Sequence, residues 1–182
     1  MAWVKSKEPP KEAETPAGVI RLKESKRPFV ELIKTPTSTM IQTNWERKEV
    51  RYDVFLVPPG NDKEREIGRI TLVYKKLHEI ELPKLRDAFV KLGLKDGDKI
   101  AMINTFYPIP FEEKDTPAGK KLAPSEELSK KRIGSVVLAE ILEKCESEGA
   151  KAVYCCTKNL IMQHMLDKNG FQKTEYFHFK LL

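Results

Sequence analysis

Residues 132–171, RIGSVVLAEILEKCESEGAKAVYCCTKNLIMQHMLDKNGF, decide the predicted fold because three elements follow one another there. Apolar side chains recur every three or four positions from Ile133 to Cys145, which predicts a helix that ends at Gly149. The run AVYCCT that follows is apolar throughout, as in a strand buried on both faces. A second helix is predicted from Asn159 to Gly170, with Ile161 among its buried side chains. This order predicts an α/β or α+β domain.

Four further strands and one further helix are predicted outside this stretch. The strands are VRYDVFLV (50–57), REIGRITLVYKKL (65–77), KIAMINTFYPIPF (99–111) and FQKTEYFHFKLL (171–182), and the helix is LPKLRDAFVKLG (82–93). The short polar connection between the first two strands predicts an antiparallel hairpin. In the helix, Leu85, Phe89 and Leu92 share one face, and Gly93 is a suitable C-terminal stop.

The remaining segments show weaker patterns. Residues 1–18 are rich in Pro, Lys and Glu and are predicted to form a flexible arm, which leaves residues 19–182 as a single domain. The segment up to Pro36 is predicted to hold a strand and a short helix. Residues 112–131 read as a polar loop, and loops of this length are usually functional or disordered. The helix after that loop is expected to begin near Ser125, whose hydroxyl can cap it.

The composition favours an acidic partner. The 182 residues carry a net charge of +6, which suits nucleic acid, a phosphate-bearing cofactor or an anionic surface, although a solvated basic surface explains it equally. A basic cluster in the second half could bind nucleic acid; its members are Lys120, Lys121, Lys130, Lys131 and Arg132. No aromatic side chains are interleaved with the cluster for base stacking, which argues against nucleic acid binding as the main function.

The expected compartment and the expected state of the cysteines follow from sequence features that the chain lacks. No window holds about 20 consecutive apolar residues, and the first 18 residues lack the apolar core of a signal peptide, so a cytoplasmic protein without membrane attachment is expected. The three cysteines, Cys145, Cys155 and Cys156, include no CxxC pair and have no histidine at metal-ligand spacing. We therefore expect buried, reduced thiols and no metal site.

Two motifs carry a resemblance to a known family. The run SKKRIG (129–134) precedes the long helix, and NLIMQHMLDKNGF (159–171) follows the apolar strand. On these motifs residues 99–182 resemble the GNAT acetyltransferase family. The resemblance implies a mixed, mostly antiparallel central sheet flanked by helices. It also implies acetyl-CoA as co-substrate, and transfer of the acetyl group to an amine of a small molecule or protein.

The resemblance also implies a cofactor site at the start of the long helix. Helix N-termini bind phosphate oxygens through free N–H groups and a positive dipole end, and glycine lets the backbone approach closely. The strand before Asn159 is expected to part from its neighbour to admit the pantetheine arm, with the Asn side chain binding that arm. The implied cofactor-binding residues are Lys131, Arg132, Ile133, Gly134, Ser135, Tyr154 and Asn159.

The chain departs from the family pattern at three places. Arg132 stands where the motif has its first glycine, and a side chain there could crowd the pyrophosphate or pair with it. Leu166 stands where many members carry a tyrosine that protonates the departing thiolate. The final hairpin of the family is expected to be cut to one strand, so that the missing strand would come from elsewhere or from a second chain, as in a homodimer.

The catalytic candidates each have a simpler interpretation. Glu112 and Glu113 follow the strand that in the family often holds a general base, and His164 could replace the missing tyrosine. All three are also explained as solvated surface residues. Tyr154 and Tyr176 could supply a hydroxyl, although aromatic packing explains them equally.

The predicted function is acyl-CoA-dependent N-acetyl transfer by direct attack of a neutral amine on the thioester. Two alternatives remain. One is a catalytically inactive GNAT-fold binding or regulatory module, which Arg132 and Leu166 favour. The other is a nucleic-acid-associated basic protein, whose binding would weaken steeply with added salt.

Overall fold

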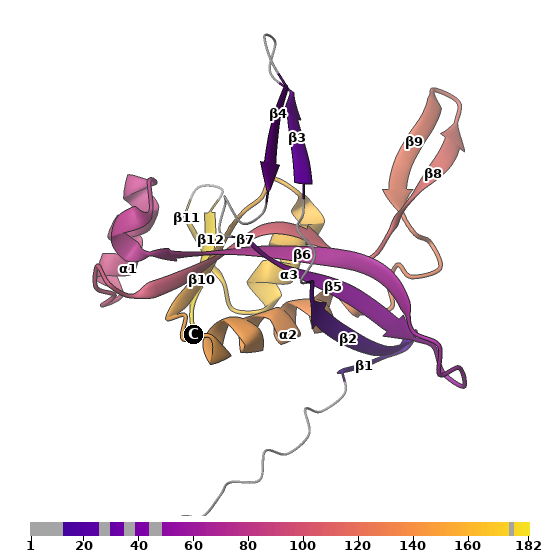
Figure 1. Ribbon diagram of the computed structural model, residues 1–182, viewed down its shortest axis with the longest axis horizontal. Coiled ribbons are helices and arrows are strands. Elements are labelled where there is room, and N and C mark those ends of the chain that lie inside the picture. Colours follow the sequence, from indigo (N-terminus) through magenta and orange to yellow (C-terminus); the bar gives the residue numbers. More distant parts are fainter. Residues whose placement is uncertain (1–12, 26–29, 35–38, 44–48, 175–176) are drawn as a thin grey trace, which may run out of the picture.

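One eight-stranded sheet joins the two halves of the chain (Figure 1). The computed structural model describes residues 13–25, 30–34, 39–43, 49–174 and 177–182. The strand order is β1-β2-β5-β6-β7-β10-β12-β11. Its strands are β1 (Ala13–Thr15), β2 (Gly18–Glu24), β5 (Glu49–Val57), β6 (Arg65–Lys76), β7 (Lys99–Tyr107), β10 (Ala152–Cys156), β11 (Gln172–Thr174) and β12 (Phe177–Leu181). β7 and β10 are parallel, and every other neighbouring pair in the described sheet is antiparallel, which confirms the predicted mixed sheet.

Helices cover both faces of this sheet and create two cores. The larger core lies under α2 (Ile133–Ser147) and α3 (Leu160–Lys168), and the smaller lies under α1 (Pro83–Lys91) and the 3-10 turn η1 (Leu77–Glu79). β10 contributes to both because its side chains alternate between the faces, as predicted for the apolar run. Leu85 and Phe89 of α1 are buried, whereas Leu92, the C-cap residue that was predicted to share their face, is 36% exposed. No helix in the described part of the chain is long and apolar enough to cross a membrane.

The connection from β7 to β10 contains an unpredicted hairpin. Residues 112–131 were expected to form a loop, but β8 (Phe111–Thr116) and β9 (Gly119–Pro124) pair into a separate two-stranded sheet that projects from the domain (Figure 1). α2 begins at Ile133 and not near Ser125. Ser125 is buried and forms a preceding turn, in which its carbonyl accepts bonds from the amide and hydroxyl of Ser129.

The C-terminal hairpin is complete, so the expectation of a single final strand is wrong. β12 lies between β10 and β11, and Thr174 pairs with Phe177. A second chain is therefore not needed to complete this end of the sheet. Gly170, at φ 81°, provides the left-handed turn that ends α3 and lets the chain enter β11.

The first half also differs from its prediction. The short helix expected before Pro36 is instead strand β3 (Val30–Lys34), which pairs with β4 (Thr39–Thr43). The last part of the expected arm forms β1, and residues 1–12 lie outside the described residues.

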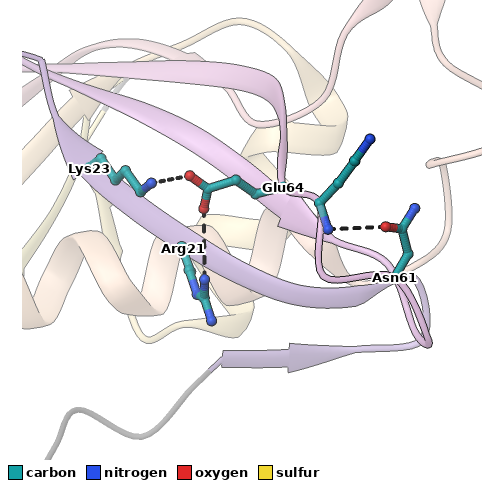
Figure 2. A network of polar contacts seen from close by, with 5 residues as sticks. Arg21, Lys23, Asn61 and Glu64 are labelled. Atoms are coloured by element: carbon teal, nitrogen blue, oxygen red, sulfur yellow. Dashed lines mark hydrogen bonds and ion pairs between the residues drawn. The ribbon is translucent and has the colours of Figure 1, made fainter.

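The connection between β5 and β6 is tied to β2 by charged side chains. Glu64 accepts a hydrogen bond from Lys23 and lies 3.8 Å from Arg21, and Asn61 Oδ1 accepts a bond from the Lys63 amide in the same turn (Figure 2). β5 and β6 pair antiparallel on either side of this connection, which confirms the predicted hairpin.

Candidate functional site

The candidate site lies where the two parallel strands part. Pairing between β7 and β10 runs from Ile100 opposite Ala152 to Ile103 opposite Cys155 and then stops. β7 continues alone on this side to Tyr107. Ligands of sheets with parallel strands usually bind beyond the carboxyl ends of those strands, where the connections diverge. We call this place, past Ile103 and Cys155, the fork.

The first turn of α2 offers unused backbone donors. The first helical hydrogen bond runs from the Val136 amide to the Arg132 carbonyl over 3.1 Å, and no side chain caps the helix. The amides of Ile133, Gly134 and Ser135 precede that bond and have no partner within the helix. Together with the positive end of the helix dipole they form a site for an anion.

The turn before α2 has a strained backbone. Lys130 and Arg132 adopt left-handed conformations, at φ 60° and 62°. This region costs a non-glycine residue about 1–2 kcal/mol, and turns of this kind point successive amides into a shared concavity that binds anions. Lys130, Lys131 and Arg132 are exposed and form no ion pair with another described residue. The left-handed Arg132 stands where the resemblance places a glycine.

Gly134 brings three elements together. A Cβ atom at this position would lie 3.3 Å from Met165 Sδ on α3 and 3.8 Å from Pro108 Cγ, just beyond β7. The helix start therefore packs against both the end of β7 and the body of α3, next to the fork.

Asn159 explains the polar start of α3. Its Oδ1 accepts bonds from the amides of Ile161 and Met162, over 3.0 and 3.1 Å, so it is the N-cap. The side-chain oxygen is thus used within the protein, and α3 is capped where α2 is not. Ile161, predicted to be buried, is 79% exposed, whereas Leu166 is completely buried.

A buried carboxylate near the fork was not predicted. Glu49, on β5, is 7% exposed, and its Oε1 accepts a 2.7 Å bond from Asn104 Nδ2 on β7. The sequence gives no local signal for this pair because 55 positions separate its members.

An open pocket of about 450 Å³ lies beyond the end of β7. Tyr107 and Phe111 border it as an edge-to-face pair with ring centres 5.7 Å apart, and they are 46% and 49% exposed. Gly68 also lines the pocket, and its backbone lies so close to β7 that a Cβ there would be 2.1 Å from the Tyr107 carbonyl oxygen. The charged side chains at its border are Arg51, Glu66 and Arg69.

Comparison with solved structures assigns the fold. Arabidopsis thaliana NAA60 in complex with a bisubstrate analogue is 14% identical and superposes with a TM-score of 0.50, over 74% of this chain and 75% of that chain. This chain has the GNAT fold. The same protein with acetyl-CoA gives 14% identity, coverage of 73% and 76%, and a TM-score of 0.48. AtaT complexed with acetyl-methionyl-tRNAfMet is 11% identical and superposes with a TM-score of 0.44, over 76% of this chain and 74% of that chain. No family model and no curated protein matches the chain.

Within this GNAT fold, the predicted phosphate-binding residues lie together. Lys131, Arg132, Ile133, Gly134 and Ser135 form one continuous turn and helix start. Asn159 lies at the start of α3, the helix that touches Gly134 through Met165.

Tyr154 is placed apart from that group. Its ring is buried in the core under α1, with its centre 6.3 Å from that of Phe89, and burial raises the pKa of its hydroxyl to about 12. Its side chain therefore packs in the core, in agreement with the simpler interpretation of Tyr154 as a packing aromatic. Tyr176 lies outside the described residues.

The three catalytic candidates are not gathered at the fork. Glu112 and Glu113 are exposed on the projecting β8, where Glu113 pairs with Lys120 over 3.2 Å. His164 is exposed on α3. Among the described residues, no hydrogen bond or ion pair joins these side chains to the first turn of α2.

The cysteines are free thiols. Burial raises the pKa of Cys145 to about 11 and that of Cys155 to about 12, so both stay protonated at neutral pH and are poor nucleophiles. Cys156, which was expected to be buried, is exposed at the end of β10. Although the residue is exposed, neighbouring protein atoms partly desolvate its thiol, which raises the thiol pKa.

Only one lysine in the hairpin part of the basic cluster is paired with an acidic neighbour: Lys120 pairs with Glu113, whereas Lys121 forms no ion pair with another described residue. Lys130, Lys131 and Arg132 lie beside the α2 amides, where their charge suits a compact phosphate group better than an extended strand of nucleic acid.

Proposed function

We propose that this protein binds acetyl-CoA at the fork and transfers the acetyl group to an amine. The observation that carries the proposal is the uncapped first turn of α2, which leaves three amides and three cationic side chains unused beside the fork. α3, only one strand away in the chain, is capped by Asn159, which accepts bonds from two amides of its first turn. A helix start that is left open in this way suits a ligand that brings its own negative charge.

The residues present fit acetyl-CoA. The amides of Ile133–Ser135 would bind the pyrophosphate, with Arg132 and Lys131 adding charge. The edge of β7 past Ile103 would pair with the amide groups of the pantetheine arm, because β10 no longer occupies it. Acetyl-CoA supplies an activated acyl group, and the chain would act mainly by placing an amine against it.

Calorimetric titration of acetyl-CoA tests the binding step. We expect micromolar affinity for the wild type and a loss of at least about tenfold in Ser135→Glu, which puts a carboxylate beside the proposed pyrophosphate site. The same carboxylate favours the helix N-terminus, so the melting temperature should stay or rise. Ser147→Glu, at the far end of α2, adds the same charge and should leave the affinity unchanged. Wild-type protein that fails to bind acetyl-CoA would overturn the proposal.

A non-catalytic CoA-binding module is the second candidate function. It is favoured by Leu166, which is completely buried in the larger core and offers no proton donor at the position of the family's tyrosine. Release of free CoA thiol, measured with peptide N-termini, free lysine and polyamines as acceptors, separates the two. Tight binding without thiol release for any acceptor class would favour the module.

A further inference from the structure

Glu49 is a carboxylate held inside the sheet on the face away from α2. Its neighbours Val50 and Tyr52 point into the larger core, so alternation places Glu49 on the opposite face, which α1 partly covers. Among the residues whose exposure is described, Glu49 is the only acidic residue that is buried. Burying a carboxylate is costly unless specific contacts hold it, and such a group is a candidate for function.

Asn104 links this carboxylate to the fork. The pairing of β6 with β7 passes from Thr71 opposite Thr105 to Leu72 opposite Ile103, which leaves Asn104 as a bulge residue. Ile103 is also the last residue of β7 that pairs with β10, so Asn104 is the first residue past the fork. Bulges redirect side chains and are frequent beside active sites. The 2.7 Å bond from Asn104 Nδ2 thus holds Glu49 Oε1 beside the fork.

By strand register, the described charged side chains beside Glu49 on the same face include Arg51 on β5 and Lys75 on β6. Arg51 lies 2.7 Å from Asp53 and 3.6 Å from Glu66.

We propose that Glu49 is the proton acceptor for the amine substrate, an inference that rests on the proposed acetyl transfer. The amine enters as an ammonium ion on the face opposite α2. Glu49 takes one proton, and the electron pair left on nitrogen forms the C–N bond to the acetyl carbon as the C–S bond breaks. The sulfur keeps the electron pair of the broken bond and takes a second proton from the nitrogen. Glu49 then returns its proton to solvent.

Kinetics with glycinamide, a small primary amine, tests the role of Glu49. Glu49→Gln keeps an oxygen that can accept the bond from Asn104, so the fold should be retained. At saturating acetyl-CoA we expect kcat to fall about 100-fold or more near neutral pH, and the rate to follow only the fraction of free amine as the pH rises. The exposed Glu24→Gln on β2 is the matched control and should keep the wild-type rate. Unchanged kcat and pH profile in Glu49→Gln would overturn the proposal.

A spectroscopic readout does not depend on turnover. In protein labelled with 13C at glutamate carboxyls, acetyl-CoA should shift the Glu49 signal, because the thioester end would lie at the fork, and should leave that of Glu24 in place. Acetyl-CoA that binds without moving the Glu49 signal would refute the role of Glu49 while the proposed function stands. Absence of acetyl-CoA binding would refute both.

Discussion

Met165 fills the space in front of Gly134: a Cβ atom on the glycine would lie 3.3 Å from the methionine sulfur. Replacing Gly134 by Val should therefore overpack the junction of α2 and α3 and lower the free energy of unfolding by about 1–3 kcal/mol. Met165→Ala alone should also destabilise the protein, because it leaves a gap. In the double variant the two losses should not add, since the valine uses the space that the methionine vacates.

Urea unfolding of the two single variants and the double variant measures this coupling. Strictly additive losses would show that the two side chains do not meet. Met165→Ala keeps Gly134 and the α2 amides, so its acetyl-CoA affinity should stay closer to the wild-type value than that of Gly134→Val.

Asn159 should contribute to stability through its side-chain oxygen. Asn159→Ala removes the acceptor for the amides of Ile161 and Met162, and should lower the free energy of unfolding by about 1 kcal/mol. Asn159→Asp keeps an acceptor and places a negative charge at a helix N-terminus, so its stability should match the wild type or exceed it. Thermal unfolding distinguishes the variants. Equal destabilisation by both would indicate that the amide nitrogen, and not the capping oxygen, is the important group.

The parts of the fold that could be predicted are those in which contact with a core imposes a regular spacing of apolar residues. The apolar run of β10 and the spacing from Ile133 to Cys145 both follow from contacts with a core. β8 and β9 form a ribbon exposed along almost its whole length, so their sequence lacks the alternation that reveals a half-buried strand. The start of α2 was misplaced for a related reason: Lys130 and Arg132 adopt conformations that their residue types do not suggest.

The candidate site also has one part that could be predicted from a local pattern and one part that could not. The α2 amides could be predicted because one continuous motif carries them. Glu49 and Asn104 could not, because only the register of three neighbouring strands and one bulge brings them together. Asn159 was singled out for binding the cofactor, and its capping bonds account for it without a ligand.

Arg132 allows strain and charge to be separated. Arg132→Gly removes both the charge and the left-handed penalty, whereas Arg132→Ala removes the charge alone. We expect the glycine variant to be more stable than the alanine variant by about 1 kcal/mol, since part of the relief is offset by the greater freedom of glycine in the unfolded chain. Both should bind acetyl-CoA several-fold more weakly than the wild type, and with a smaller dependence on salt. Urea unfolding and calorimetry at two salt concentrations measure these effects, and an alanine variant as stable as the glycine variant would contradict the strain.

Cys155 should make the protein less stable at alkaline pH. Burial raises the pKa of its thiol from 9.0 to about 12, so between these values the unfolded chain has released a proton that the folded chain still holds. The stability from this group is complete below pH 9 and is lost as the pH rises, by up to about 1.4 kcal/mol per pH unit. Cys155→Ala should cost stability at pH 7 yet show a shallower decline up to pH 10.5 in urea unfolding. Val153→Ala, on the same buried strand face, removes volume without a titrating group, so its decline should match that of the wild type. A decline in Cys155→Ala as steep as in Val153→Ala would show that the thiol does not carry the effect.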